Sequence, residues 1–289
     1  LVPERMIRDL AGVEYLPALI EIDCQRSSVQ KMDLSKNTEL MILNCYKANL
    51  QGKLDLSKNT KLEGASCHNN KDLTAIDISG CQELVSLSCD NTAVTELDFS
   101  NNPKFKSLSC AATGISSLDF SNNPELTIVS AYNTQISSFD ASANPKLEML
   151  DLSLSKLTSL DVSGNTALIE LFVDENPLAW LNVGNNPNLK AIISDSTISL
   201  EVPGSSFDIT KEIPGIDPSK VSIVSGAVLN GTAVSGYDFD TPIVYNYDCG
   251  ISSEGKLTLN VTVDLTEEKS DTVVPDTDKP SGQDKTPAS

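Results

Sequence analysis

Residues 157–171 read LTSLDVSGNTALIEL, and their frame of apolar residue, Asp, apolar residue and usually Ser recurs along the chain. The aspartates of successive copies lie 21 or 22 residues apart, and an eighth copy carries Asn182 instead; the seven are Asp33, Asp55, Asp77, Asp98, Asp119, Asp140 and Asp161. A fixed period of this length is typical of a solenoid, in which each copy forms one coil stacked on the last. A solenoid offers a long regular surface, which favours binding over catalysis.

Each repeat also holds a second apolar pattern, Leu-x-x-Leu-x-Cys, as in Leu84, Leu87 and Cys89. Apolar and other residues alternate in both patterns, which indicates strands, and no stretch between them is long enough for a helical stripe. We therefore predict a mainly β fold, a right-handed leucine-rich-repeat solenoid of about nine coils of 21–22 residues. Each coil would contribute two short strands, so that stacking forms two parallel sheets around a leucine core.

Polar residues mark the turns. An asparagine follows each Asp-x-Ser segment at a fixed distance, except in the third copy, which carries Cys81; the asparagines are Asn37, Asn59, Asn102, Asn123, Asn144, Asn165 and Asn186. Asparagine side chains bind nearby backbone groups in turns, and cysteine is the alternative residue in the leucine-rich-repeat consensus. We expect a structural role for both.

Five of the seven cysteines follow the repeat, and they are Cys24, Cys45, Cys67, Cys89 and Cys110. Later copies fill this position mostly with apolar residues, namely Ala131, Leu152 and Val173, before Ser194. The position therefore faces the core, where cysteine acts as a small apolar residue. We predict a stacked ladder of reduced thiols, with a metal site or disulfides as the alternative; no C-x-x-C spacing supports zinc.

The composition limits the function classes. The chain has 289 residues, a net charge of −19 and one histidine. An acidic surface repels phosphate and anionic lipid, so we expect no nucleic-acid partner, and no apolar run is long enough for membrane insertion. One histidine and no Gly-x-Ser-x-Gly motif predict a protein that is not an enzyme and needs no cofactor.

The unit at 157–171 resembles the repeats of secreted or surface-anchored leucine-rich-repeat proteins of gut bacteria, and is similar in period and surface role to the internalins. The resemblance covers roughly residues 5–202, including a variant first coil at 3–24, although the Asp-x-Ser frame, the cysteine position and the missing helical cap depart from internalins. It implies an extracellular or cell-surface location, with the signal segment outside this chain. Internalins recognise host receptors through the concave face, which implies adhesion or recognition here.

The pattern changes after the solenoid, which we place at residues 1–202. Residues 203–266 contain alternating stretches at 220–224, 242–247 and 256–263, separated by turn signals such as Asn230-Gly231. They predict a small antiparallel β module, sandwich-like as in immunoglobulin-like domains. Residues 267–289 are rich in Asp, Pro, Lys and Ser and predict a disordered linker.

The outward positions of the Leu-x-x-Leu-x-Cys strands form the candidate site. Aromatic and apolar residues stand around a floor of small residues there, which suits capture of a protein. The candidate ligand-binding residues are Ile42, Tyr46, His68, Asp90, Ile128, Tyr132, Met149, Phe172 and Asp174. The partner would be a host or bacterial extracellular protein. Two alternatives are a glycan, for which Tyr132 and Phe172 would form a coplanar pair, and a stalk that projects another domain.

Two further features of the sequence bear on binding. Trp180, the single tryptophan, lies next to the β module, and we predict that it anchors the interface between the two parts rather than a ligand. The aspartate row predicts a network with the serines that follow, which orders each turn. The alternative is a row of weak calcium sites, but each repeat supplies one acid. We therefore assign no metal site.

Overall fold

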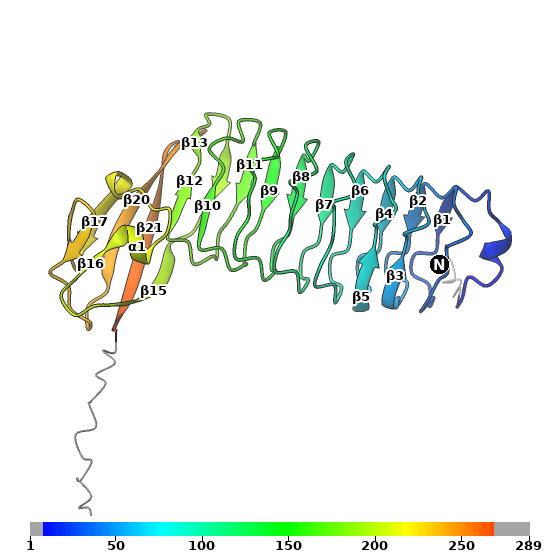
Figure 1. Ribbon diagram of the computed structural model, residues 1–289, viewed down its shortest axis with the longest axis horizontal. Helices are drawn as coiled ribbons and strands as arrows, with labels where there is room; N and C mark the ends of the chain where they lie inside the picture. The colour runs from blue at the N-terminus through cyan, green and yellow to red at the C-terminus, as the bar shows by residue number, and fades with distance from the viewer. Residues whose placement is uncertain (1–7, 269–289) are drawn as a thin grey trace, which may run out of the picture.

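The computed structural model describes residues 8–268, and its main feature is a parallel sheet with one strand from each coil (Figure 1). The nine strands follow chain order: β1 (Glu21–Asp23), β2 (Ile42–Asn44), β4 (Gly64–Ser66), β6 (Ser86–Ser88), β7 (Ser107–Ser109), β8 (Ile128–Ser130), β9 (Met149–Asp151), β11 (Glu170–Phe172) and β14 (Lys190–Ile192). A short 3-10 helix, η1 (Val13–Tyr15), precedes them. The predicted solenoid with a period of about 21 residues is confirmed.

Packing follows the repeat, because the middle residue of nearly every strand points into the core. Leu87, Leu108 and Leu150 are each at most 2% exposed. Aromatic rings fill the middle of the solenoid, where Phe99 lies 4.4 Å from Phe105 and 5.0 Å from Phe120 between ring centroids. Equivalent side chains of adjacent coils therefore stack along the solenoid axis.

The predicted second strand forms in only some coils. Two parallel pairs exist, β3 (Gln51–Asp55) with β5 (Asp72–Asp77), and β10 (Ser159–Asp161) with β12 (Trp180–Asn182). Elsewhere the prediction is wrong, and the corresponding segments of adjacent coils are linked by a single backbone hydrogen bond, such as the 3.0 Å bond from Gly114 N–H to the Val94 carbonyl. The apolar residues of these segments are buried all the same. The alternation of apolar and polar residues therefore predicted which side chains point inward, but it did not predict whether the backbones of adjacent coils pair as strands.

Buried asparagines connect the coils as a ladder. Asn123 Nδ2 donates to the carbonyls of Phe99 (3.2 Å) and Asn102 (2.8 Å), and this geometry recurs at Asn59, Asn102, Asn144 and Asn165. Cys81 takes the same position and directs its thiol to the Leu56 carbonyl at 3.3 Å. The predicted structural role of both residue types is confirmed.

Eight of the nine strands of this sheet, all but β14, are followed by one residue in the left-handed region. The φ angles lie between 51° and 60° at Arg26, Lys47, Asn69, Asn91, Ala112, Asn133, Leu154 and Glu175. Most of their amides donate to the next coil, as in the 2.9 Å bond from Asn91 N–H to the Ala111 carbonyl. Because left-handed geometry is costly for residues other than glycine, these inter-coil bonds hold the turn in place.

All seven cysteines are free and buried, and the five in phase with the repeat line the core as predicted. Burial raises the pKa of Cys24 to about 11, and it raises the pKa of the fully buried Cys67 well above its ordinary value. Thiols in this setting stay protonated at neutral pH and are poor nucleophiles. The cysteine ladder therefore has a structural role in packing the core.

The C-terminal part is built on a five-stranded mixed sheet joined to the last coil. Its strands are β13 (Gly184–Asn185), β15 (Ser196–Val202), β17 (Val221–Ser225), β20 (Ile243–Ser252) and β21 (Gly255–Glu267). A second sheet holds β16 (Ser206–Asp208), β18 (Val228–Asn230) and β19 (Ala233–Ser235), and two short helices are α1 (Ile209–Glu212) and η2 (Pro218–Lys220). Apolar residues from both sheets and from α1, including Phe207, Ile209 and Tyr245, share one core.

This sheet has antiparallel strands as predicted, but two of its pairings are parallel. The last coil contributes β13, which runs parallel to β20, and β15 runs parallel to β21. Both β13 and β15 precede residue 203, where we placed the start of the module; that boundary stays a prediction. Strand β21 continues to Glu267, inside the predicted linker, and residues 269–289 lie outside the described part.

Candidate functional site

The candidate residues lie on the outer face of the nine-stranded sheet, which we call the concave face, and they occupy two kinds of position there. Ile42, Ile128, Met149 and Phe172 belong to strands β2, β8, β9 and β11, and they flank the buried middle residue. Tyr46, His68, Asp90, Tyr132 and Asp174 lie just before the left-handed turn residue of their coils. Ile42 (40%), Ile128 (39%) and Tyr132 (42%) are exposed, and the other six are half-buried.

An aromatic cluster stands at the N-terminal end of this face. The rings of Tyr46 and His68 are stacked, with centroids 4.4 Å apart and planes 22° apart. The guanidinium of Arg26 lies 5.8 Å from the centre of the Tyr46 ring, within cation–π range. These residues come from successive coils, whose strand spacing of about 4.8 Å suits ring stacking. The strand pattern did not indicate Arg26, because this residue is the left-handed turn residue that follows the strand.

A hydrogen-bond chain continues from His68 across the next coils. His68 Nδ1 contacts Ser66 Oγ at 3.0 Å and Ser88 Oγ at 3.2 Å, and the Ser88 hydroxyl donates to Asp90 Oδ2 at 3.0 Å. Since Ser88 has one hydroxyl proton and gives it to Asp90, its contact with His68 requires a proton on Nδ1. In the neutral ring, Nε2 is then the nitrogen that can accept a hydrogen bond.

Asp90 serves to order the face. Its carboxylate also accepts from Ser109 Oγ at 2.7 Å and from the Ala111 amide at 2.7 Å. Four oxygen lone-pair sites on a carboxylate are thus largely used by the protein itself. The chain of His68, Ser88 and Asp90 is not a catalytic triad, because the carboxylate contacts the serine and not the histidine.

A second, more apolar cluster stands at the C-terminal end. Register places Ile128 beside Met149, and Phe172 beside Ile192 of β14. Ile192 is 52% exposed, although it lies two residues before Ser194, where the Leu-x-x-Leu-x-Cys pattern predicts a buried apolar residue. Strand β14 pairs with β11 one residue out of phase with the repeat, since Leu171 faces Ala191 and not Ile192. Within residues 8–268 no tenth coil follows β14 in this sheet to fix its register. Tyr132 and Phe172 make no ring contact within residues 8–268, and Asp174 accepts from Ser153 Oγ at 2.7 Å.

Between the clusters lies a polar floor of small residues, formed by Ser86, Ser88, Ser107, Ser109 and Ser130. Its hydroxyls are partly engaged with Asp90. The concave face therefore presents two raised clusters separated by a low, hydrogen-bonding surface.

The aspartate row forms the predicted network with its serines. Each Oδ1 accepts from the amide two residues on, as in the 2.9 Å bond from Ser57 to Asp55, and these bonds lower the pKa of the carboxyls. Lys53, at 2.8 Å, and Ser79 lower the pKa of Asp77 to about 2. Within residues 8–268, no three His, Cys, Asp or Glu side chains are grouped to hold a metal ion.

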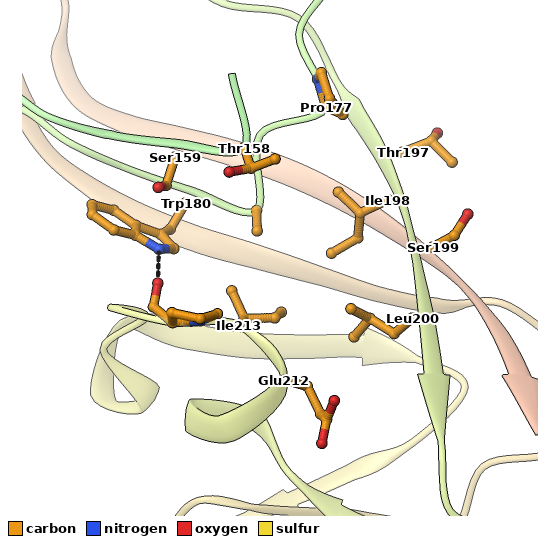
Figure 2. A pocket seen from close by; sticks show the side chains of 12 residues that line it. Thr158, Ser159, Pro177, Trp180, Thr197, Ile198, Ser199, Leu200, Glu212 and Ile213 are labelled. Carbon is orange, nitrogen blue, oxygen red and sulfur yellow. Dashed lines mark hydrogen bonds between the residues drawn. The ribbon is translucent and has the colours of Figure 1, made fainter. Parts of the chain in front are cut away.

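Trp180 lies where the solenoid meets the C-terminal sheets (Figure 2). Its indole Nε1–H donates to the Pro214 carbonyl at 3.0 Å, and its ring packs so close to Gly215 that a Cβ there would be 2.8 Å from Cζ2. Nearby, the Tyr245 hydroxyl donates to the Ala179 carbonyl at 2.7 Å. A groove of about 460 Å³ opens beside the indole.

None of the described helices is both long and apolar enough to span a bilayer.

Comparison with solved structures shows an internalin-like fold. The functional domain of InlJ from Listeria monocytogenes, described as including a cysteine ladder, matches with a TM-score of 0.58 and 21% identity over 90% of this chain and 79% of that one. From the same organism, the internalin InlF gives 0.45 and 22% over 66% and 67%, and the internalin-like protein lmo2027 gives 0.48 and 16% over 87% and 88%. No family model matches the sequence, and no curated protein matches it. At these identities the likeness to InlJ concerns the fold.

Proposed function

We propose that this chain is a non-catalytic recognition protein of a bacterial surface that binds another protein through its concave face. The observation that carries the proposal is the pairing of two raised clusters across one sheet. Preformed aromatic and apolar anchors around a polar surface are the arrangement of interface hot spots. The stacked Tyr46 and His68 rings are already ordered, so little conformational entropy would be lost on binding.

The size of the face favours a protein over a small sugar. Tyr46 follows the second strand of the sheet and Ile192 lies in the ninth, seven strand spacings away. At about 4.8 Å per spacing the clusters extend over roughly 34 Å. That length is comparable to the side, about 28 Å, of a square patch of about 800 Å², which is the area that each partner buries in a standard interface. The glycan alternative depended on a Tyr132–Phe172 pair, and the two rings are not in contact.

The net charge of this chain favours a partner with a basic surface. The net charge of −19 would speed association with a basic protein surface and oppose binding to nucleic acid. The adhesion role and the surface location are part of this proposal; they rest on the internalin-like fold and on the clusters.

The test is a binding screen of the full chain against purified extracellular host and bacterial proteins and a glycan panel. For a protein that binds, Tyr46→Ala and Tyr132→Ala should each weaken the affinity by about tenfold or more, equivalent to about 1.4 kcal/mol. Lys146→Ala is the matched control, since its ammonium is exposed and pairs with Glu125 outside both clusters. Affinity that survives both tyrosine variants would remove the concave face as the site, and binding to glycans alone would replace the protein partner. A chain that binds nothing would favour the stalk.

A further inference from the structure

We propose that the groove beside Trp180 binds an extended, basic peptide segment of another protein, which adds a strand to the free edge of β15. The groove is lined by Thr197, Ile198, Ser199 and Leu200 of β15, by Pro177 and Trp180 of the last coils, and by Ile213 after α1. None of these residues belongs to the concave clusters. The site is thus independent of the function proposed above.

Strand β15 lies at the end of its sheet and pairs with β21 alone. The backbone groups of Val202 point toward β21, because its carbonyl accepts a hydrogen bond from the Glu268 amide at 2.9 Å. In a parallel pair, alternate residues direct both backbone groups to the neighbour. Thr197, Ser199 and Glu201 therefore direct their amides and carbonyls away from β21. No hydrogen bond within residues 8–268 uses these groups.

The groove lies along this free edge. Figure 2 shows Ile198 and Leu200 pointing from β15 toward the side of Trp180 and Ile213, whereas Thr197 and Ser199 point the other way. Thr197 and Ser199, whose amides and carbonyls point away from β21, also belong to the lining of the groove. The groove therefore offers unpaired backbone groups on one side and an apolar wall on the other. These are the two elements of strand addition, in which backbone bonds give affinity and side-chain pockets give specificity.

The dimensions and the charge define the occupant. A volume of about 460 Å³ lies within the range of ligand sites, and four consecutive residues of β15 line it, as an extended peptide requires. Glu212 is the one charged residue among those that line the groove, and Glu201 follows on the same strand. A second copy of this chain would bring another 19 negative charges to the edge. Lysine or arginine side chains beside one apolar anchor suit this groove better.

The test uses a fluorescent peptide, acetyl-Lys-Val-Lys-Leu-Lys-Val-Lys-amide, with anisotropy as the readout of binding to the full chain. Proline is tolerated at an edge position whose amide faces solvent, so Ser199→Pro should keep the β21 ladder and block the incoming strand. We expect this variant to bind at least about tenfold more weakly, while Ser199→Ala stays within about twofold of the original. Tyr46→Ala should leave peptide binding unchanged.

Changes to the peptide test the same idea without altering the protein. N-methylation of alternate peptide amides removes the backbone donors, and glutamate in place of lysine reverses the charge; both should abolish binding. The proposal is overturned if the original peptide does not bind at about 1 mM, or if the methylated peptide binds equally well. It is also overturned if the chain dimerises in solution and Ser199→Pro abolishes the dimer, because the occupant of the edge is then a second copy.

Discussion

Replacing Asn123 with alanine removes two hydrogen bonds between adjacent coils, and its cost can be worked out from the contacts. The amide donates to the Phe99 and Asn102 carbonyls, yet each carbonyl also accepts a backbone amide, from Asn102 and Phe105 respectively. Neither acceptor is left unsatisfied, so the loss is about 0.5–1.5 kcal/mol per bond, or about 1–3 kcal/mol in all. The Oδ1 atom has no hydrogen-bond partner within residues 8–268, so its removal returns part of this free energy.

The isosteric change Asn123→Asp separates hydrogen bonding from packing. It keeps the volume but sets an oxygen against two carbonyl oxygens in a fully buried position, and it should cost more than alanine. Urea denaturation followed by circular dichroism measures both, and about 1–3 kcal/mol corresponds to a fall in Tm of roughly 2–12 °C. Asn122→Ala, at the exposed neighbouring position, is the control. If Asn123→Ala shifts stability no more than Asn122→Ala, or if the aspartate variant is no worse than alanine, the ladder does not stabilise the stack as we argue.

Two more predictions concern contacts between adjacent coils. At Gly80 a Cβ would lie 1.9 Å from the Ser57 carbonyl oxygen, so Gly80→Ala should destabilise by about 1–3 kcal/mol, whereas Gly164→Ala, in the same turn position with nothing within 4 Å, should stabilise by about 0.4–1 kcal/mol. Equal effects in thermal melts would show that the close approach at Gly80 is not real. Asp77 has a folded pKa depressed to about 2 by Lys53 and Ser79, so its contribution is present above its unfolded pKa and lost as pH falls from about 4 to about 2. Unfolding free energies of Asp77→Asn should change less over this window, and an unaltered slope would count against the argument.

The repeat determined most of what could be predicted. A residue such as Leu87 or Cys89 recurs in the same place of many coils, so its burial could be inferred from its neighbours in the pattern. Ile192 could not, because it lies in the last strand, where one neighbouring coil is missing and the register slips. Strand β15 pairs with β21, more than 50 residues later, and no local pattern encodes that partner.

The candidate site was predictable in its positions but not in its contacts. The spacing placed Tyr46 and His68 one coil apart on the same face. Whether their rings would stack, and whether His68 would be bound by serines, depends on side-chain rotamers that alternation does not specify. Arg26 reaches Tyr46 from a left-handed turn residue, outside the strand positions that the pattern describes.

The asparagine ladder has a consequence for how this surface can change over evolution. Each buried amide finds its acceptors in the coil before it, so duplication or loss of one complete repeat leaves every remaining coil with its contacts. Three strand spacings separate the coil of His68 from that of Tyr132, roughly 14 Å. A gained or lost repeat between them would move the two clusters apart or together by about 4.8 Å. The distance between the anchor points is therefore a discrete variable, which selection can adjust in whole coils without redesigning the core.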